Sequence, residues 1–364
     1  MGSVKDFEPI KQPTVSKMGK GDVVYSRRYS VLDWGKERRM PDEIPYADAA
    51  RCMLAAYGFE KLRETGIQNH YHGLVSSDGS LVSTQSATEP LNRMRVDLVN
   101  VHEPPVVDDE YDYSMFRNGV RSNFVIPMEF IYRNSTPKGS SLFKRLDEGS
   151  VSLKTIGVST RPKEYQRLAT PFLDISTKFE EIDRYPDERK GQSFQQFLID
   201  YAGLSEREIA YARNVIIAID RMITKAVSRA GLNNDDGKAE LAYAPGRQLI
   251  VADEVLTPDS CRWTYVIEQT SVDLSKEISR QWYRIMDKEW VAEVDTAKKS
   301  HPADWHNYVT REPKPLPAEL VQMIGYVYAA ITNAVLEREI FSGVPTIPEI
   351  AQEYKRYREV EMHV

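Results

Sequence analysis

Apolar residues recur at helical spacing in three parts of the chain. The first predicts a helix over about Ala47–Glu64. The second begins at Ser205, where Glu208 completes a capping-box pattern, and ends at Gly231. The third runs over about 317–339, and the proline at its start suits a first turn whose N–H groups need no partner.

Continuous apolar runs predict the strands. Residues 23–25 are β-prone, and residues 123–132 form a strong buried strand that Pro127 interrupts. A short strand near Glu240 precedes a second buried strand over residues 248–252. Strands mixed with long amphipathic helices predict an α+β fold.

Three regions lack a clear period. Residues 76–119 are predicted to form a strand-loop insertion, and residues 150–191 a long charged connection. The Trp-, Lys- and Asp-rich region before the last helix is expected to be exposed. The loop after Arg133 divides the chain into a small β-rich domain, residues 1–133, and a larger α/β domain, residues 134–364.

Composition narrows the class of protein. The 364 residues are 41% hydrophobic and 28% charged with a net charge of −6, so there is a real core and no basic excess for nucleic acid. The N-terminus lacks a signal-peptide core, and no apolar run approaches a membrane span in length. The only cysteines, Cys52 and Cys261, lie far apart, which favours a reducing cytoplasm. We expect no nucleic-acid or membrane partner, and a homo-oligomer is left open.

Alternating charged residues suggest a metal and phosphate site. Asp236, Lys238 and Glu240 share one face if they lie on a strand, and a hairpin with the next strand places Asp253 beside Glu240. Two carboxylates and a lysine suit Mg²⁺ with a phosphate. Glu254 alternates to the other face and is expected to be structural. The alternative is a solvated turn.

Two other segments suit phosphate binding. The run Gly19, Lys20, Gly21 predicts a glycine turn whose backbone N–H groups approach a phosphate. Arg133 with Ser140 suits a phosphate monoester, because guanidinium binds oxyanions through two N–H groups. The alternatives are a plain hairpin turn and an exposed basic loop.

A longer comparison of motifs points to a family. Residues 249–263, LIVADEVLTPDSCRW, resemble the signature DE-x-x-(T)PDSSR-x-W of the SAICAR synthetases (phosphoribosylaminoimidazole-succinocarboxamide synthases). Further matches follow in family order between residues 18 and 282: GKGDVVY, PMEFIYRN, GSSLFKR, STKFEE, DGKAEL and SKEISRQW.

The resemblance implies a fold and a reaction. Members have a small β-rich domain over a larger α/β domain with ATP between them, related to ATP-grasp and kinase-like folds. They are ligases of de novo purine biosynthesis that join L-aspartate to the carboxylate of carboxyaminoimidazole ribotide (CAIR). The products are SAICAR, ADP and phosphate, an acyl phosphate is the intermediate, and Mg²⁺ assists ATP.

The resemblance also implies roles for residues of this sequence. The metal ligands are Glu240 and Asp253. The ATP-binding residues are Gly19, Lys20, Gly21, Lys178 and Lys238, with the backbone of residues 121–125, including Asn123 and Val125, against adenine. The residues for the ribotide and aspartate are Asp33, Arg133, Ser140, Arg262, Lys276 and Arg280, and those for catalysis are Asp236, Lys238 and Arg262.

Four departures from the family pattern leave alternatives open. Asp22 replaces a usual lysine, and residues 46–48 replace a Gly-Lys-Gly run. Glu277 and Gln281 stand where glutamine and aspartate are usual. The alternatives are a paralogous ATP-dependent amide ligase with another amine or acceptor carboxylate, and a non-catalytic nucleotide-binding relative.

Overall fold

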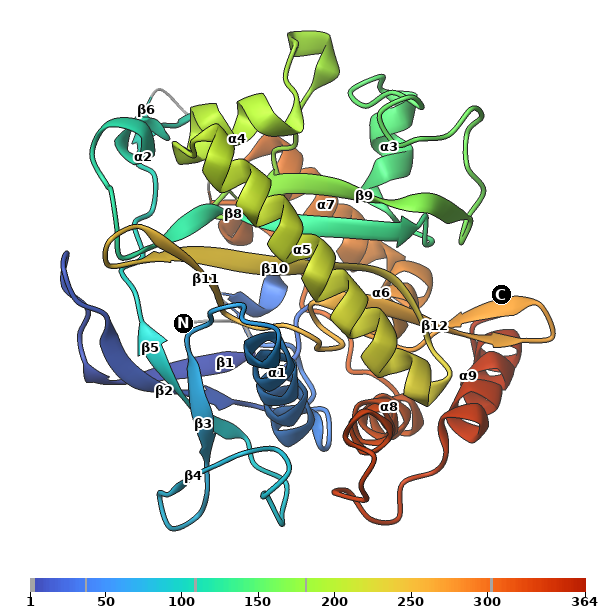
Figure 1. Cartoon of the computed structure of the whole chain (residues 1–364). Coiled ribbons are helices and arrows are strands. Elements are labelled where there is room, and N and C mark those ends of the chain that lie inside the picture. Colours follow the sequence, from blue (N-terminus) through green and yellow to red (C-terminus); the bar gives the residue numbers. More distant parts are fainter. Residues whose placement is uncertain (1–3, 37, 108–109, 181, 302–303) are drawn as a thin grey trace.

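A computed structural model describes residues 4–36, 38–107, 110–180, 182–301 and 304–364. Two antiparallel sheets dominate it (Figure 1). The first sheet has five strands, in the order β1 (Lys5–Lys11), β2 (Gly19–Tyr25), β5 (Arg93–Leu98), β3 (Tyr71–Val75) and β4 (Leu81–Val82). The predicted α+β fold is confirmed.

The second sheet carries the longest strands. Its order is β13 (Thr270–Asp273), β12 (Cys261–Ile267), β10 (Asn233–Ala244), β8 (Phe124–Ser135) and β9 (Arg167–Thr177), and β11 (Gln248–Ala252) also pairs with β10. A small ribbon joins β6 (Val106–Val107) to β7 (Glu110–Tyr111). The hairpin predicted between the Glu240 strand and residues 248–252 is therefore confirmed as β10 and β11.

One long helix covers one face of the second sheet. Helix α5 (Glu206–Val227) begins at the predicted capping box of Ser205 and Glu208, and Figure 1 shows it crossing β8 and β10. Its apolar positions point to the sheet, and Asp220 accepts a hydrogen bond from Asn134 Nδ2 at 2.6 Å. Because side chains alternate along a strand, those of β8 and β10 that do not face α5 lie on the opposite face of the sheet.

Two other long helices form the centre of the core. Helix α1 (Ala47–Glu64) has the predicted bounds and packs between the first sheet and α8 (Ala318–Leu336). By length and composition α8 could cross a membrane, so the expectation that no run approaches such a length is wrong. However, 67% of its apolar stretch is buried inside the protein, which is typical of a core helix.

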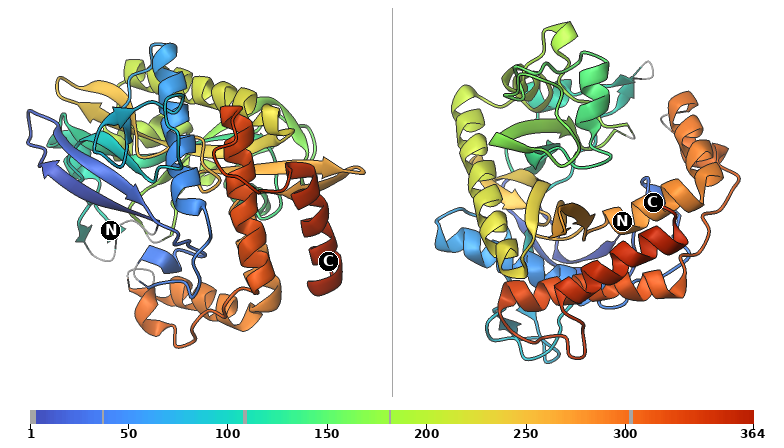
Figure 2. Two further views of the ribbon diagram at one scale, coloured as in Figure 1. Left: turned by 90° about the horizontal axis from the view of Figure 1, so that it is seen from below. Right: turned by 90° about the vertical axis from the view of Figure 1, so that its right-hand side faces the viewer.

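The remaining helices are shorter. They are α2 (Ser114–Asn118), α3 (Ser141–Asp147), α4 (Phe194–Ala202), α6 (Glu277–Met286), α7 (Lys288–Ser300) and α9 (Ile347–Glu361), with 3₁₀ turns η1 (Trp34–Lys36), η2 (Glu188–Lys190), η3 (Ser228–Ala230) and η4 (Trp305–Tyr308). Both views of Figure 2 show α9 beside α8, with the C-terminus at its end.

The Trp-rich region is buried, contrary to expectation. Trp290 and Trp305 are fully buried and pack around Trp34, with the Trp34 and Trp290 rings 5.6 Å apart and nearly perpendicular. The charged residues between them lie on the outer sides of α7, so charge density in the sequence concealed an aromatic cluster.

Two segments predicted as irregular each supply a strand. The range 76–119 contains β5, which lies between β2 and β3, and the range 150–191 contains β9, which pairs with β8. β5 alternates polar and apolar residues, so its strand period is present in the sequence, whereas β9 contains Pro171 and lacks such alternation. The predicted domain boundary after residue 133 falls inside β8 and remains a prediction.

Candidate active site

The face of the second sheet opposite α5 is strongly charged. Strand β8 contributes Glu129 and Arg133, and β10 contributes Asp236, Lys238 and Glu240, all from alternating positions. The antiparallel pairing of β8 with β10 places Glu129 opposite Glu240 and Arg133 opposite Asp236. The predicted shared face of the three β10 residues is therefore confirmed. We call these five residues the charged face.

Lysines from three segments neutralise the carboxylates at one end of the charged face. Lys178 pairs with Glu240, and Lys238 pairs with Glu129. Lys5 of β1, which is only 7% exposed, pairs with Asp253 at 2.8 Å and with Glu254 at 3.2 Å. Three lysines thus face four carboxylates, a group that we call the lysine–carboxylate cluster (Lys5, Lys178, Lys238, Glu129, Glu240, Asp253 and Glu254).

The backbone at Asp253 differs from a simple alternating strand. The cross-strand neighbour of Glu240 is Ala252, so the predicted pairing with Asp253 is off by one residue. Asp253 has φ 64°, a left-handed conformation that ends β11 and breaks the alternation. Lys5 therefore contacts both Asp253 and Glu254, and Glu254 also accepts a hydrogen bond from Thr257 at 3.0 Å. The prediction that these two carboxylates face opposite sides is wrong.

Burial and the neighbouring charges shift the pKa values of these carboxylates in opposite directions. Burial raises the pKa of Glu240, and Asp253 adds to the rise, while Lys178 opposes it. Burial also acts on Asp253, but Lys5 and Lys178 outweigh it and lower its pKa. Lys238 and Lys178 likewise outweigh burial and lower the pKa of Glu129. The lysines thus favour the ionised forms of Asp253 and Glu129, whereas burial disfavours the ionised form of Glu240.

The donor set fits Mg²⁺ with phosphate better than a metal held by protein alone. Glu240 is a buried oxygen donor and Asp253 a half-buried one, and the charge of Asp253 acts on Glu240. Within the described ranges no group of three or more His, Cys, Asp or Glu side chains could hold a metal ion. Mg²⁺ commonly takes one or two carboxylates and completes its shell with phosphate and water.

A second network of charges lies along the same face. In one cross-strand row Asp236 stands between Arg133 and Arg262. Arg262 Nε donates to Asp236 at 2.8 Å, and Arg133 Nη1 lies 3.4 Å from it. Arg133 also pairs with Asp174 of β9 at 2.9 Å, as does Arg145 of α3 at 2.6 Å. The alternative of an exposed basic loop at Arg133 is therefore wrong.

Comparison with known proteins identifies the family. A family model described as SAICAR synthetase matches residues 20–297. A protein of Archaeoglobus fulgidus described as a putative phosphoribosylaminoimidazole-succinocarboxamide synthase is 38% identical, covering 99% of this chain and 100% of its own length. This chain belongs to the SAICAR synthetase family.

Other relatives agree. The SAICAR synthetase of Thermoplasma acidophilum is 30% identical over 71% of this chain and 76% of its own length. A solved structure described as SAICAR synthase superimposes with a TM-score of 0.59 at 18% identity, covering 94% of this chain and 95% of that one. The structure from Saccharomyces cerevisiae, described as complexed with SAICAR, gives 0.56 at 19% identity over the same fractions of the two chains, so the fold is shared. The chain is a carbon–nitrogen ligase of purine biosynthesis.

The glycine motif of the family lies in a strand rather than in a turn. Gly19, Lys20 and Gly21 begin β2, and the turn lies earlier, at residues 14–17. A Cβ on Gly19 would collide with the Lys11 carbonyl, so glycine here allows the close approach of β1, and phosphate binding by these residues stays a prediction. The glycine-turn prediction is therefore wrong, although Lys20 remains exposed.

The predicted adenine segment is already hydrogen-bonded. Val125 N donates to Asn100 O at 2.9 Å, and Asn123 O accepts from Asn100 N at 3.0 Å. These two groups are committed to the protein in this structure, so adenine contact through them stays a prediction. A small apolar cluster lies beside this segment on the same side as the charged face, and its members are Ala242, Ala244, Ile250, Ala252, Met18 and Val99.

The predicted substrate residues fall in several places. Ser140 caps α3 and lies 3.4 Å from Arg133 Nη1, so these two do meet. Lys276 immediately precedes α6 and donates a hydrogen bond to the Asp259 carbonyl. Burial lowers the pKa of Lys276 to about 8, and the positive charges of Arg280 and Lys238 add to this effect. Asp33 instead pairs with Lys298 at 2.7 Å. Lys298 belongs to α7, a helix that carries none of the predicted site residues.

Several site residues were missed. Glu129 could have been found, since it alternates with Arg133 in the same predicted strand. Lys5 gave no signal, because a single lysine near the N-terminus carries no pattern. Arg51 of α1 is fully buried and pairs with Asp259, the aspartate of the PDS turn, which also accepts a hydrogen bond from Tyr328 at 2.8 Å.

Residues that differ from the family pattern have distinctive local surroundings in this structure. Asp22 is buried against Arg95 and Arg93, so its charge is compensated within the first sheet. Tyr46 adopts φ 64° just before α1. Cys261, where serine is usual, contacts the Tyr132 hydroxyl at 3.6 Å, on the sheet face away from the charged residues.

Gln281 forms a hydrogen bond with a buried aspartate, Asp273. Its Nε2 donates to Asp273 Oδ2 at 2.6 Å, and the Tyr165 hydroxyl donates to the same oxygen at 2.8 Å. Burial raises the pKa of Asp273 to about 6. The folded state therefore holds the proton more tightly than the unfolded chain, so this group's contribution to stability falls as pH rises from about 4 to about 6.

We predict that Gln281→Asp, which restores the usual family residue, destabilises this protein. Two buried carboxylates would replace a hydrogen-bonded pair, at a cost of about 2–3 kcal/mol at pH 7.5. Urea unfolding should show the loss shrinking at pH 5, where one carboxyl takes up a proton. Gln281→Asn is the matched control, because it shortens the side chain equally without adding charge. Equal losses for both variants at pH 7.5 would contradict the charge explanation.

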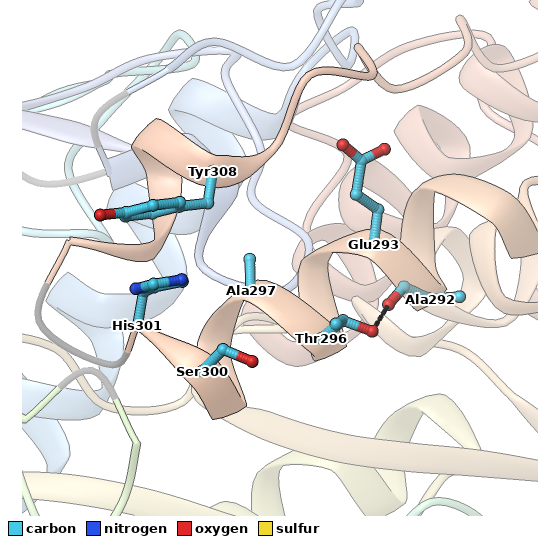
Figure 3. Close-up of a pocket in the computed structure, with 7 residues that line it drawn as sticks. All are labelled: Ala292, Glu293, Thr296, Ala297, Ser300, His301 and Tyr308. Carbon is cyan, nitrogen blue, oxygen red and sulfur yellow. Dashed lines mark hydrogen bonds between the residues drawn. The ribbon is translucent and has the colours of Figure 1, made fainter.

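A surface groove lies apart from this site. It has a volume of about 500 Å³ and is lined by α7 and the segment around η4 (Figure 3). His301 and Tyr308 stack across it with ring centroids 3.5 Å apart. Its one acidic residue, Glu293, already accepts hydrogen bonds from Thr310 at 2.7 and 2.8 Å. Among the described residues that line it there is no lysine or arginine to bind a nucleotide or a ribotide phosphate.

Proposed function

We propose that the charged face and the lysine–carboxylate cluster together bind ATP and CAIR and catalyse the ligation of L-aspartate to CAIR. The observation that carries this proposal is the row of buried and half-buried charges on β8 and β10, which ends at Glu240 and continues to Asp253. Paired carboxylates and mobile cations side by side are what phosphoryl transfer to a carboxylate requires.

The nucleotide lies along this row. The small apolar cluster around Ala242 and Ile250 offers a flat surface for adenine. Without nucleotide, Lys178 pairs with Glu240 and Lys238 pairs with Glu129. When ATP binds, both lysines turn to its phosphates. Each lysine then exchanges one anionic partner for another, so neither charge is left buried and unpaired.

Glu240 and Asp253 would hold Mg²⁺, which shields the charge of the phosphates and aligns them for transfer. Lys5 keeps Asp253 ionised and fixed in position. The left-handed backbone at Asp253 turns its carboxylate off the strand and towards Lys5.

The chemistry proceeds in two displacements. A carboxylate oxygen of CAIR attacks the γ-phosphorus, the bond to the β-phosphate oxygen breaks, and ADP leaves. The neutral amine of aspartate then attacks the acyl carbon, and phosphate leaves with the oxygen that came from the carboxylate. The amine nitrogen gives up one proton, which leaves with the phosphate. Lys276 and Arg280 supply positive charge for the substrate anions, and Asp236 holds Arg262 and Arg133 in position.

The compartment is the cytoplasm. Cys52 and Cys261 are both free and buried, which supports a reducing environment. The partners are the small-molecule substrates ATP, CAIR and L-aspartate.

Incubation with ATP, Mg²⁺, CAIR and aspartate tests the function. We expect SAICAR absorbance to rise with one ADP per product, and no product when any substrate is omitted. Glutamate and asparagine serve as matched amines. Product with another amine but not with aspartate would favour a paralogous ligase, and ATP binding without turnover for any amine would favour a non-catalytic relative.

A further inference from the structure

The arginines first expected to bind the ribotide phosphate are committed to the protein. Arg133 is only 2% exposed, and its guanidinium contacts Asp174, Asp236 and Ser141. Arg262 points both Nε and Nη2 at Asp236. Asp174 and Asp236 thus already share the charge of both guanidinium groups, so a dianionic phosphate calls for further cations nearby.

Arg284, in the last turn of α6, the helix that follows Lys276, is placed to do so. Its side chain is 38% exposed, so an anion can reach it. Its Nη1 lies so close to the Gly139 backbone that a Cβ there would sit 3.0 Å away. The guanidinium therefore lies against the loop that leads into Ser140, where a residue with a side chain would push it aside.

Glu277 holds two arginines together at this place. It accepts from Arg280 Nη1 at 2.9 Å and from Arg284 Nη1 at 3.3 Å, and it is 1% exposed. With Arg262 nearby, three guanidinium groups surround one carboxylate and outweigh burial, so that the pKa of Glu277 is lowered to about 2. Arg262 is paired with Asp236, so Arg280, Arg284 and Glu277 together keep a net charge of +1 at neutral pH. The side chains of Arg280 and Arg284 are 31% and 38% exposed, so their outward sides are open to solvent.

We propose that Arg284 is a phosphate-binding residue that closes, with Arg280, on the ribotide 5′-phosphate against the Gly139–Ser140 loop. This inference rests on the proposed function, since it takes CAIR as the acceptor. A guanidinium can bind two phosphate oxygens at once, which fixes the ribotide and hence the direction of its carboxylate. The same chemistry would suit the carboxylates of aspartate, so the test separates the two anions.

Equilibrium binding provides the test without turnover. The probes are SAICAR and its riboside, which lacks the phosphate, and the measured quantity is the ratio of their Kd values. Arg284→Gln should lower the preference for the ribotide by ~10–100-fold and leave the Kd values of the riboside and of ATP unchanged. Arg284→Lys should recover part of the preference, because it retains the charge but not the paired donors.

Arg311→Gln is the matched control. Arg311 pairs with Glu289 at 2.8 Å and Glu293 at 3.4 Å, away from the charged face, so the same change of charge should leave the preference intact. An unchanged preference in Arg284→Gln, or a rise confined to the KM of aspartate, would overturn the inference. If the wild type binds the ribotide through Arg284 but forms no product with aspartate, the inference stands and the proposed function fails.

Discussion

Asp253→Asn lowers kcat by about 10³-fold and weakens the binding of ADP much less. In the proposed site the carboxylate would share the metal with Glu240, and an amide oxygen is a poorer ligand because it carries no charge. The change also leaves Lys5, which is buried, with Glu254 as its remaining carboxylate partner. Steady-state rates at saturating substrates and calorimetric binding of ADP, with and without Mg²⁺, measure the two effects separately.

Glu254→Gln is the control for this prediction. Glu254 is the adjacent carboxylate and contacts the same lysine, but it also accepts from Thr257 and so acts in the structure of the turn. We expect less than about a tenfold change in kcat and a loss of stability of about 1–3 kcal/mol. A rate unchanged in Asp253→Asn would remove Asp253 from the metal site.

Asp174→Asn should unfold the protein at a markedly lower urea concentration. Asp174 is 2% exposed and accepts from both Arg133 and Arg145. Without its charge, two buried guanidinium groups lose their shared partner, and breaking a buried pair costs about 3–5 kcal/mol. The arginines should also reorient, so the KM of CAIR should rise together with the loss of stability.

Asp147→Asn is the matched control for burial. Asp147 also pairs with an arginine, Arg161, but both side chains are more than half exposed. Water screens such a pair, and we expect a loss of no more than about 1 kcal/mol. Equal shifts in the urea midpoint for the two variants would contradict the role given to burial.

The sequence was most informative where chemistry followed a strand period. Alternation of Asp236, Lys238 and Glu240 predicted one face, and β10 has that face. The hairpin with β11 followed from two adjacent apolar runs. The pattern failed at Asp253, because one left-handed residue shifts every later side chain and leaves no mark in the order of apolar and polar residues.

Other parts of the site depend on contacts between distant segments. Lys5 and Glu254 are 249 positions apart, and no local period could join them. The glycines of β2 predicted a turn because glycine allows turns, but here they admit the close approach of β1. Residue pairs such as Gln281 with Asp273 become understandable only when both buried partners are seen together.

The transfer of oxygen tests the central claim most directly. CAIR labelled with ¹⁸O in its carboxylate is converted with ATP and aspartate in a single turnover, and the phosphate produced is analysed by mass spectrometry. The account predicts one ¹⁸O atom in each phosphate, because the carboxylate oxygen that attacks the γ-phosphorus leaves with it. Formation of SAICAR with unlabelled phosphate would contradict an acyl phosphate formed at the charged face.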